Sequence, residues 1–177
     1  DTTAANLIEQ LKLDINYEDA IGVTYEEWAE NPDECLSTLV TRYSDLASNY
    51  DVMVVLGSDF ADVADSIEVS LNAHLATNFN APVIVVVNAA GLTPAQVKRA
   101  AQYATKEIQS MHNQVLGAVA TRVAAGEVEA VLAGLSTIPE LIVSAIQEDP
   151  LLGAPSVREQ FTAVNAAIVN GSDERLD

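Results

Sequence analysis

The chain has 177 residues, of which 49% are hydrophobic and 19% are charged. This length fits one domain with one core, and the charged fraction is too low for a disordered polymer. Eight basic residues against 26 acidic ones give a net charge of −18, so neither a nucleic acid nor a membrane is expected as a partner. No apolar run approaches the roughly 20 residues that a membrane helix needs.

Cys35 is the only cysteine, which excludes an intrachain disulfide and a cysteine-based zinc site. No basic and apolar leader opens the sequence, so we expect a soluble protein of the reducing cytoplasm. The chain starts at Asp1 and runs directly into a helical pattern, which is typical of a domain entered partway through a longer polypeptide.

The first 50 residues favour helices. Residues 3–12 have apolar residues at helical spacing, and Asn31-Pro32 is a strong helix start with a capping side chain followed by proline. Between them, eight acidic residues and no basic one occupy residues 14–34, with a short strand predicted over Ile21 to Tyr25.

From residue 51 the pattern alternates between strand and helix. The unbroken apolar character of the strands indicates burial on both faces, with Val54 and Val85 at their centres. Strands separated by helices favour a parallel sheet. The sequence therefore predicts an α/β fold in three layers, a mostly parallel sheet with helices on both faces. The predicted strands lie in 51–60 (ending at Gly57), 83–88, 115–123 and 141–146, with an edge strand near Ala166 to Val169, and the helices in 64–79, 93–111 and 126–137.

Ligands of such sheets bind beyond the carboxyl ends of the strands. The weak candidates for binding at these ends are Ser58, Asp59, Asn88, Thr121 and Arg122, and Glu148-Asp149 lies at the same edge. Acidic residues at three-residue steps follow the first strand and fit either a Mg²⁺ site or, as we favour, helix-start acids facing solvent. They are Asp59, Asp62, Asp65 and Glu68.

Other chemistry-bearing residues favour structural roles. The acidic run 14–34 has no ligand spacing and reads as a solvated face. His74 and His112 lie on predicted helices without partners at ligand spacing, and Cys35 lies near a helix start that lowers a thiol pKa. None of the phosphate-loop, dinucleotide-binding, nucleophile-elbow or Cys-x-x-Cys strings occurs, so motifs alone assign no reaction.

Several strings taken in order resemble the amino-terminal domain of long bacterial phosphate acetyltransferases. The most specific is the Leu-Asn-Ala-His-Leu-Ala-x-Asn string within 70–88, followed by Ala-Pro-Val. The others are YEDAIGVTYEE (17–27), STLVTRY (37–43), DVMVVLGSDF (51–60), LGAVATRV (116–123) and EDPLLGAPSV (148–157).

The resemblance implies a dethiobiotin-synthetase-like domain related to P-loop NTPases, whose first strand and Gly-rich loop would precede Asp1. It places Leu56 where dethiobiotin synthetase has a Mg²⁺-binding glutamate, and Thr121 where it has an adenine-reading asparagine. The implied family reaction converts acetyl-CoA and phosphate to acetyl phosphate and CoA in a separate carboxyl-terminal domain.

The resemblance therefore implies no catalytic residue, cofactor or metal on residues 1–177, and the fragment alone is predicted to be inactive. We expect one domain over 1–177, with 148–177 leading to the next, and a regulatory or assembly role. The expected partners are the remaining domains of the same polypeptide and further copies in a homo-oligomer. The alternative is an ATP-dependent ligase-like enzyme of the dethiobiotin synthetase or cobyrinic acid a,c-diamide synthase type, with its P-loop missing here.

Overall fold

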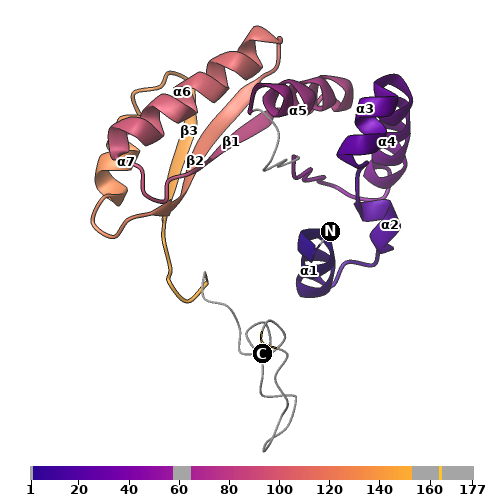
Figure 1. Ribbon diagram of the computed structural model, residues 1–177, viewed down its shortest axis with the longest axis horizontal. Coiled ribbons are helices and arrows are strands. Elements are labelled where there is room, and N and C mark those ends of the chain that lie inside the picture. The colour runs from indigo at the N-terminus through magenta and orange to yellow at the C-terminus, as the bar shows by residue number, and fades with distance from the viewer. Residues whose placement is uncertain (1, 58–64, 153–163, 165–177) are drawn as a thin grey trace, which may run out of the picture. The chain divides into compact units, whose positions relative to one another are not determined.

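The computed structural model describes residues 2–57, 65–152 and 164 (Figure 1). The chain divides into two compact units, residues 1–85 with 102–116, and residues 86–101 with 117–177. One helix and two strands run through both units. A single domain over residues 1–177 therefore stays a prediction.

Helices occupy most of the first 47 residues: α1 (Thr2–Leu11), α2 (Tyr17–Ala20), α3 (Tyr25–Glu30) and α4 (Pro32–Ala47). The predicted start of α4 is confirmed, because the Asn31 side chain accepts the Glu34 backbone N–H and Pro32 opens the helix. Proline is tolerated there because the first helical N–H has no partner within the helix. The polar side chain of Asn31 thus caps the start of a helix.

The predicted strand over Ile21 to Tyr25 is wrong. Residues 21–24 form a loop and Tyr25 begins α3, which Thr24 and Glu27 start with a reciprocal capping box. The Arg42 guanidinium, on α4, donates to the backbone carbonyls of Ile21 and Gly22. A side chain from a neighbouring helix therefore satisfies carbonyls that a strand would have paired with another strand.

The predicted buried strand in 51–60 is also wrong over its described part. Residues 51–57 form no strand, and the Val54 side chain, expected at its centre, is 88% exposed. An isolated strand gains no backbone hydrogen bonds, and no strand among the described residues pairs with this segment. We call Val52–Leu56 the unpaired apolar segment.

The next helix, α5 (Asp65–Phe79), confirms the predicted helix over 64–79. It contacts α4 through the stacked rings of Tyr43 and Phe79, whose centroids lie 4.3 Å apart. The buried Asn113 carboxamide, just before β2, donates to the Ala73 carbonyl at 3.1 Å and accepts from the Thr77 hydroxyl at 3.0 Å. Both α5 partners belong to the string that carries the resemblance most specifically.

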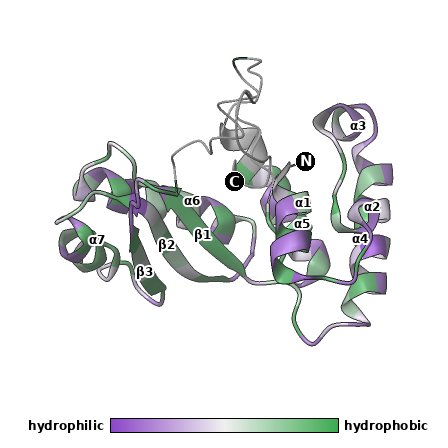
Figure 2. Ribbon diagram, turned by 90° about the horizontal axis from the view of Figure 1, so that it is seen from below, coloured by the Kyte–Doolittle hydropathy of each residue, from purple (hydrophilic) through white to green (hydrophobic). Residues whose placement is uncertain are grey.

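Three parallel strands form the described sheet in the order β1-β2-β3: β1 (Val83–Asn88), β2 (Val115–Val123) and β3 (Ile142–Gln147). All three lie where the sequence predicts strands. Burial alternates along β1, with Val85 and Val87 buried while Ile84 and Val86 are 56% and 64% exposed. Figure 2 shows β1 as apolar nearly throughout.

Each crossover between these strands is a helix (Figure 1): α6 (Pro94–Ser110) joins β1 to β2, and α7 (Val128–Leu135) joins β2 to β3. Their inward residues are among the most buried of the chain, with Val97 and Leu135 fully enclosed. Three parallel strands with helices around them confirm the predicted α/β class. The predicted edge strand over Ala166 to Val169 lies outside the described residues.

Gly117 lets β2 and β3 approach closely. It pairs with Ile142, and a Cβ atom at residue 117 would collide with the Ile142 carbonyl oxygen. Glycine in a strand commonly marks such a close backbone approach. No helix among the described residues is long and apolar enough to span a membrane.

Candidate functional site

The carboxyl ends of the three strands meet at one edge of the sheet. The Ala89 N–H, just after β1, donates to the Thr121 carbonyl of β2 at 2.8 Å. The Glu148 N–H, just after β3, donates to the Val123 carbonyl at 2.8 Å. The structure thus brings Asn88, Thr121 and Arg122 together with Glu148, although their role in binding stays a prediction.

Two of the five candidate residues, Ser58 and Asp59, lie outside the described residues, as does Asp62. Immediately before them, a Cβ atom at Gly57 would lie 2.9 Å from the Asn72 side-chain oxygen of α5. The chain therefore passes close to α5 at this point, where a larger side chain would force Asn72 to move.

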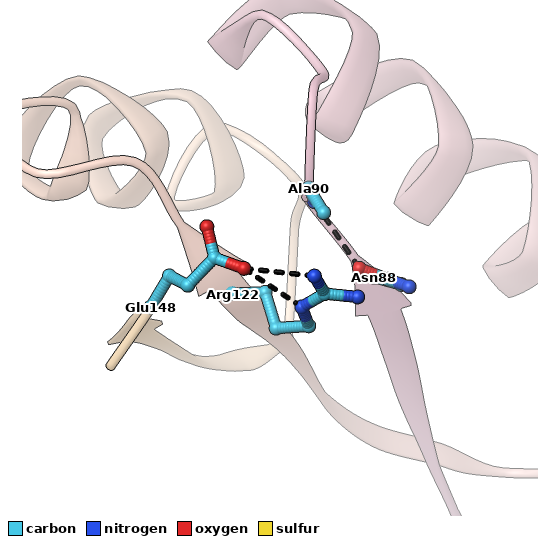
Figure 3. Close-up of polar contacts among 4 residues, drawn as sticks. All are labelled: Asn88, Ala90, Arg122 and Glu148. Atoms are coloured by element: carbon cyan, nitrogen blue, oxygen red, sulfur yellow. Dashed lines mark hydrogen bonds and ion pairs between the residues drawn. The ribbon is translucent and has the colours of Figure 1, made fainter. Parts of the chain in front are cut away.

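The polar side chains of Asn88 and Thr121 bind backbone groups of the edge itself. The Asn88 side-chain oxygen accepts the Ala90 N–H at 3.1 Å, which holds the turn after β1 (Figure 3). The Thr121 hydroxyl donates to the Val87 carbonyl at 3.5 Å. These contacts give both side chains a structural role in joining β1 to β2 and shaping the turn.

Arg122 is the only basic residue among edge residues 88–91, 121–122 and 148–149. Its Nε and Nη2 atoms both donate to Oε1 of Glu148, at 3.0 and 2.8 Å (Figure 3). The two side chains are 56% and 39% exposed. The positive charge of this candidate binding residue is therefore neutralised by Glu148, 26 positions along the chain.

The backbone at Arg122 is also unusual. The register between β2 and β3 shifts between Ala120 and Val123, and Arg122 has φ of 55°. This left-handed conformation is uncommon for residues other than glycine. Bulges of this kind bend a strand and re-aim its side chains.

The acidic residues of the run 14–34 are all exposed, as predicted for a solvated face. Several of them act in local helix starts; for example, Glu27 accepts the Thr24 N–H and Glu34 accepts from the Asn31 side chain. Within the described part of the chain, no group of three or more His, Cys, Asp or Glu side chains is placed to hold a metal ion.

Cys35 is buried on α4, with 8% of its surface exposed. Burial raises the pKa of the thiol, and the nearby Glu27 and Glu34 carboxylates raise it further. The prediction of a lowered pKa is therefore wrong, because burial and negative charge outweigh the helix start. His74 and His112 are both exposed.

Sequence reasoning missed an open hollow where residues 13–19 face the end of α4. It is lined by Leu13, Asp14, Ile15, Asn16, Asp19, Leu46, Asn49 and Tyr50. No basic residue or thiol lines it, and Asp19 is bound by the Asn16 side chain at 3.1 Å. It arises from tertiary proximity and leaves no motif in the sequence.

A profile of the AAA domain family matches residues 1–156. The chain belongs to this family. The assignment agrees with the P-loop-NTPase-like fold that the resemblance implies. Yet residues 1–177 contain no Gly-x-x-x-x-Gly-Lys-Ser/Thr string, and Arg122, the one basic residue among edge residues 88–91, 121–122 and 148–149, is held in an ion pair.

Two curated relatives are phosphate acetyltransferases. This AAA domain is 26% identical over 175 residues to the enzyme of Synechocystis sp., covering 94% of the chain and 25% of the relative. It is 25% identical over 182 residues to the enzyme of Nitratidesulfovibrio vulgaris, covering 97% of the chain and 26% of the relative. The chain thus spans about a quarter of the length of the curated relatives it matches. No solved structure matches the chain.

Proposed function

We propose that this AAA domain has a non-catalytic regulatory or assembly role within a phosphate acetyltransferase. The similarity to two such enzymes supports placement in a protein that transfers acetyl groups to phosphate. The match to a quarter of their length supports a role as one domain among several. The proposed partners are the other domains of the same polypeptide and further copies of it, in the cytoplasm.

The observation that carries the non-catalytic assignment is the neutralised edge. An enzyme that transfers a phosphoryl group needs donors and cations aimed at the phosphates. Among edge residues 88–91, 121–122 and 148–149 there is one guanidinium, already paired with Glu148, and a single cation is too few to hold the phosphates of a nucleotide. Leu56, at the position of the Mg²⁺-binding glutamate in the resemblance, has no side-chain oxygen to bind the ion.

The first test is acetyl transfer. Residues 1–177 alone should form no acetyl phosphate from acetyl-CoA and phosphate, because the transferring residues are proposed to lie elsewhere. CoA release, followed with a thiol reagent, provides the measurement, and a no-protein blank sets the background. In the longer polypeptide, removing residues 1–177 should preserve the chemistry while changing oligomeric order or response to effectors. Turnover by the isolated domain would contradict the proposal.

Membership in a P-loop-like family favours a second candidate, an ATP-dependent ligase-like enzyme. The two functions differ in nucleotide binding. We expect no saturable binding of Mg-ATP at millimolar concentration by calorimetry and no rise in melting temperature. A ligand present at 100 times its dissociation constant would stabilise by about 2.7 kcal/mol, which a thermal scan detects. Tight binding, by this chain or by one extended upstream of Asp1, would favour the enzymatic candidate.

A further inference from the structure

The Arg122–Glu148 pair lies where the chain leaves the sheet. Glu148 directly follows β3, and its backbone N–H continues the ladder by donating to Val123. A turn follows at once, in which the Asp149 carboxylate accepts the Leu151 N–H at 2.9 Å and its carbonyl accepts the Leu152 N–H at 3.1 Å. The direction of residues 148–152 is therefore fixed by few contacts, and the ion pair is one of them.

Arg122, the partner of Glu148, lies in the bulge of β2. Arg122 sits in the bulge with φ of 55°, a conformation that costs free energy for a residue with a side chain. Such strain is found where the surrounding structure holds it in place. In this conformation the Arg122 guanidinium reaches Glu148 and donates two hydrogen bonds to its Oε1 atom (Figure 3).

Another oxyanion can replace Glu148 in this ion pair. Both side chains reach solvent, and an exposed ion pair contributes little to stability. The Nε and Nη2 atoms offer the paired donors that any carboxylate or phosphate accepts. Among the described residues, Nη1 of Arg122 has no hydrogen-bond partner, so the guanidinium can engage an incoming oxyanion before Glu148 leaves.

We propose that the Arg122–Glu148 pair is a latch that fixes the chain after β3, and that a small oxyanion opens it by replacing Glu148 on the guanidinium. The ligand is a carboxylate or an inorganic phosphate. The net charge of −18 disfavours the larger polyanions, and so does the presence of one cation among edge residues 88–91, 121–122 and 148–149. The regulatory meaning of the latch rests on the proposed function, but its opening does not depend on any acetyl transfer.

Amide hydrogen exchange followed by NMR tests the latch directly. Arg122→Gln should speed exchange of the Glu148 N–H by about two- to fivefold, the factor expected for loss of an exposed ion pair. Exchange within β1 should not change. Arg99→Gln is the matched control, because Arg99 is exposed on α6 and makes no ion pair within the described residues. It removes the same charge without touching the edge.

Titration with sodium phosphate and, separately, sodium acetate tests the opening, with sodium chloride at equal ionic strength as reference. In the parent chain, one or both should speed Glu148 exchange saturably and shift the Arg122 Nε–H resonance. The salt that responds identifies phosphate or carboxylate as the ligand. Glu148→Gln should strengthen this binding several-fold by removing the internal competitor, whereas Glu129→Gln, on exposed α7 surface, should not.

Two results would overturn the proposal. One is parent-like Glu148 exchange in a folded Arg122→Gln variant, which would mean that the pair fixes nothing. The other is an equal change in Glu148 exchange with chloride, phosphate and acetate, which would mean that the salts act only by screening charge. Neither result bears on Mg-ATP binding or acetyl transfer, so the proposed function is judged separately.

Discussion

At the scale of single residues, burial separates two valines that the sequence makes equivalent. Val85 in β1 is 6% exposed, whereas Val54 in the unpaired apolar segment is 88% exposed. A carboxylate introduced at a buried position loses its hydration without gaining a partner, whereas one at an exposed position stays in water.

Val85→Asp should therefore destabilise the protein by several kcal/mol, comparable with the whole stability of a domain of about 5–15 kcal/mol. Val54→Asp should stay within about 0.5 kcal/mol of the parent, as exposed substitutions usually do. Urea unfolding followed by circular dichroism measures both. Equal destabilisation by the two variants would show that residues 52–56 are buried in solution.

At the scale of elements, the close pairing of β2 and β3 depends on the missing side chain of Gly117. Gly117→Ala should cost about 1–3 kcal/mol, the usual range for overpacking, because the new Cβ meets the Ile142 carbonyl. Gly134→Ala is the matched control, since its Cβ would lie 3.7 Å from Lys98 Cβ, an ordinary contact. That substitution within α7 should be neutral or stabilise by about 0.5–1 kcal/mol. The melting temperatures of both variants test this prediction. An unchanged melting temperature for Gly117→Ala would contradict the close approach of β2 and β3 at this residue.

The elements also differ in how far the sequence predicts them. The N-cap of α4, the strands β1, β2 and β3, and the helices α5, α6 and α7 lie where local patterns place them. Residues 21–24 and 51–57 do not. The former are held by Arg42, 20 residues along the chain, and the latter lack a partner strand within the described residues.

At the scale of the whole molecule, charge repulsion opposes folding. The net charge is −18, and within the described residues one ion pair, Arg122–Glu148, supplies a direct attraction between charged side chains. Raising sodium chloride from 10 to 150 mM shortens the Debye length from about 30 Å to about 8 Å. Screening should therefore weaken the repulsion far more than it weakens attraction.

We expect the melting temperature to rise over that range of salt. Each 1 kcal/mol of added stability corresponds to roughly 2–4 °C for a chain of this length. Differential scanning calorimetry at neutral pH, with protein concentration fixed, gives the measurement. A melting temperature that falls with salt would mean that ion pairs, rather than repulsion, dominate the electrostatics of the fold.

The sequence by itself determined the α/β class, the three described strands and the starts of the main helices. These features depend on residues close together in the chain, through side-chain periodicity, capping and turn chemistry. The sequence also placed Asn88, Arg122 and Glu148 at one sheet edge, because parallel strands end on the same side.

Only the tertiary structure decided what those residues do there. The partner of Arg122 lies 26 positions along the chain, and neither the burial that raises the Cys35 pKa nor the exposure of Val54 follows from the residues beside them in the sequence. Such contacts are set by how elements meet, and a residue's own neighbours along the chain do not specify its partner. The charge at the edge was therefore visible in the sequence, and its neutralisation was not.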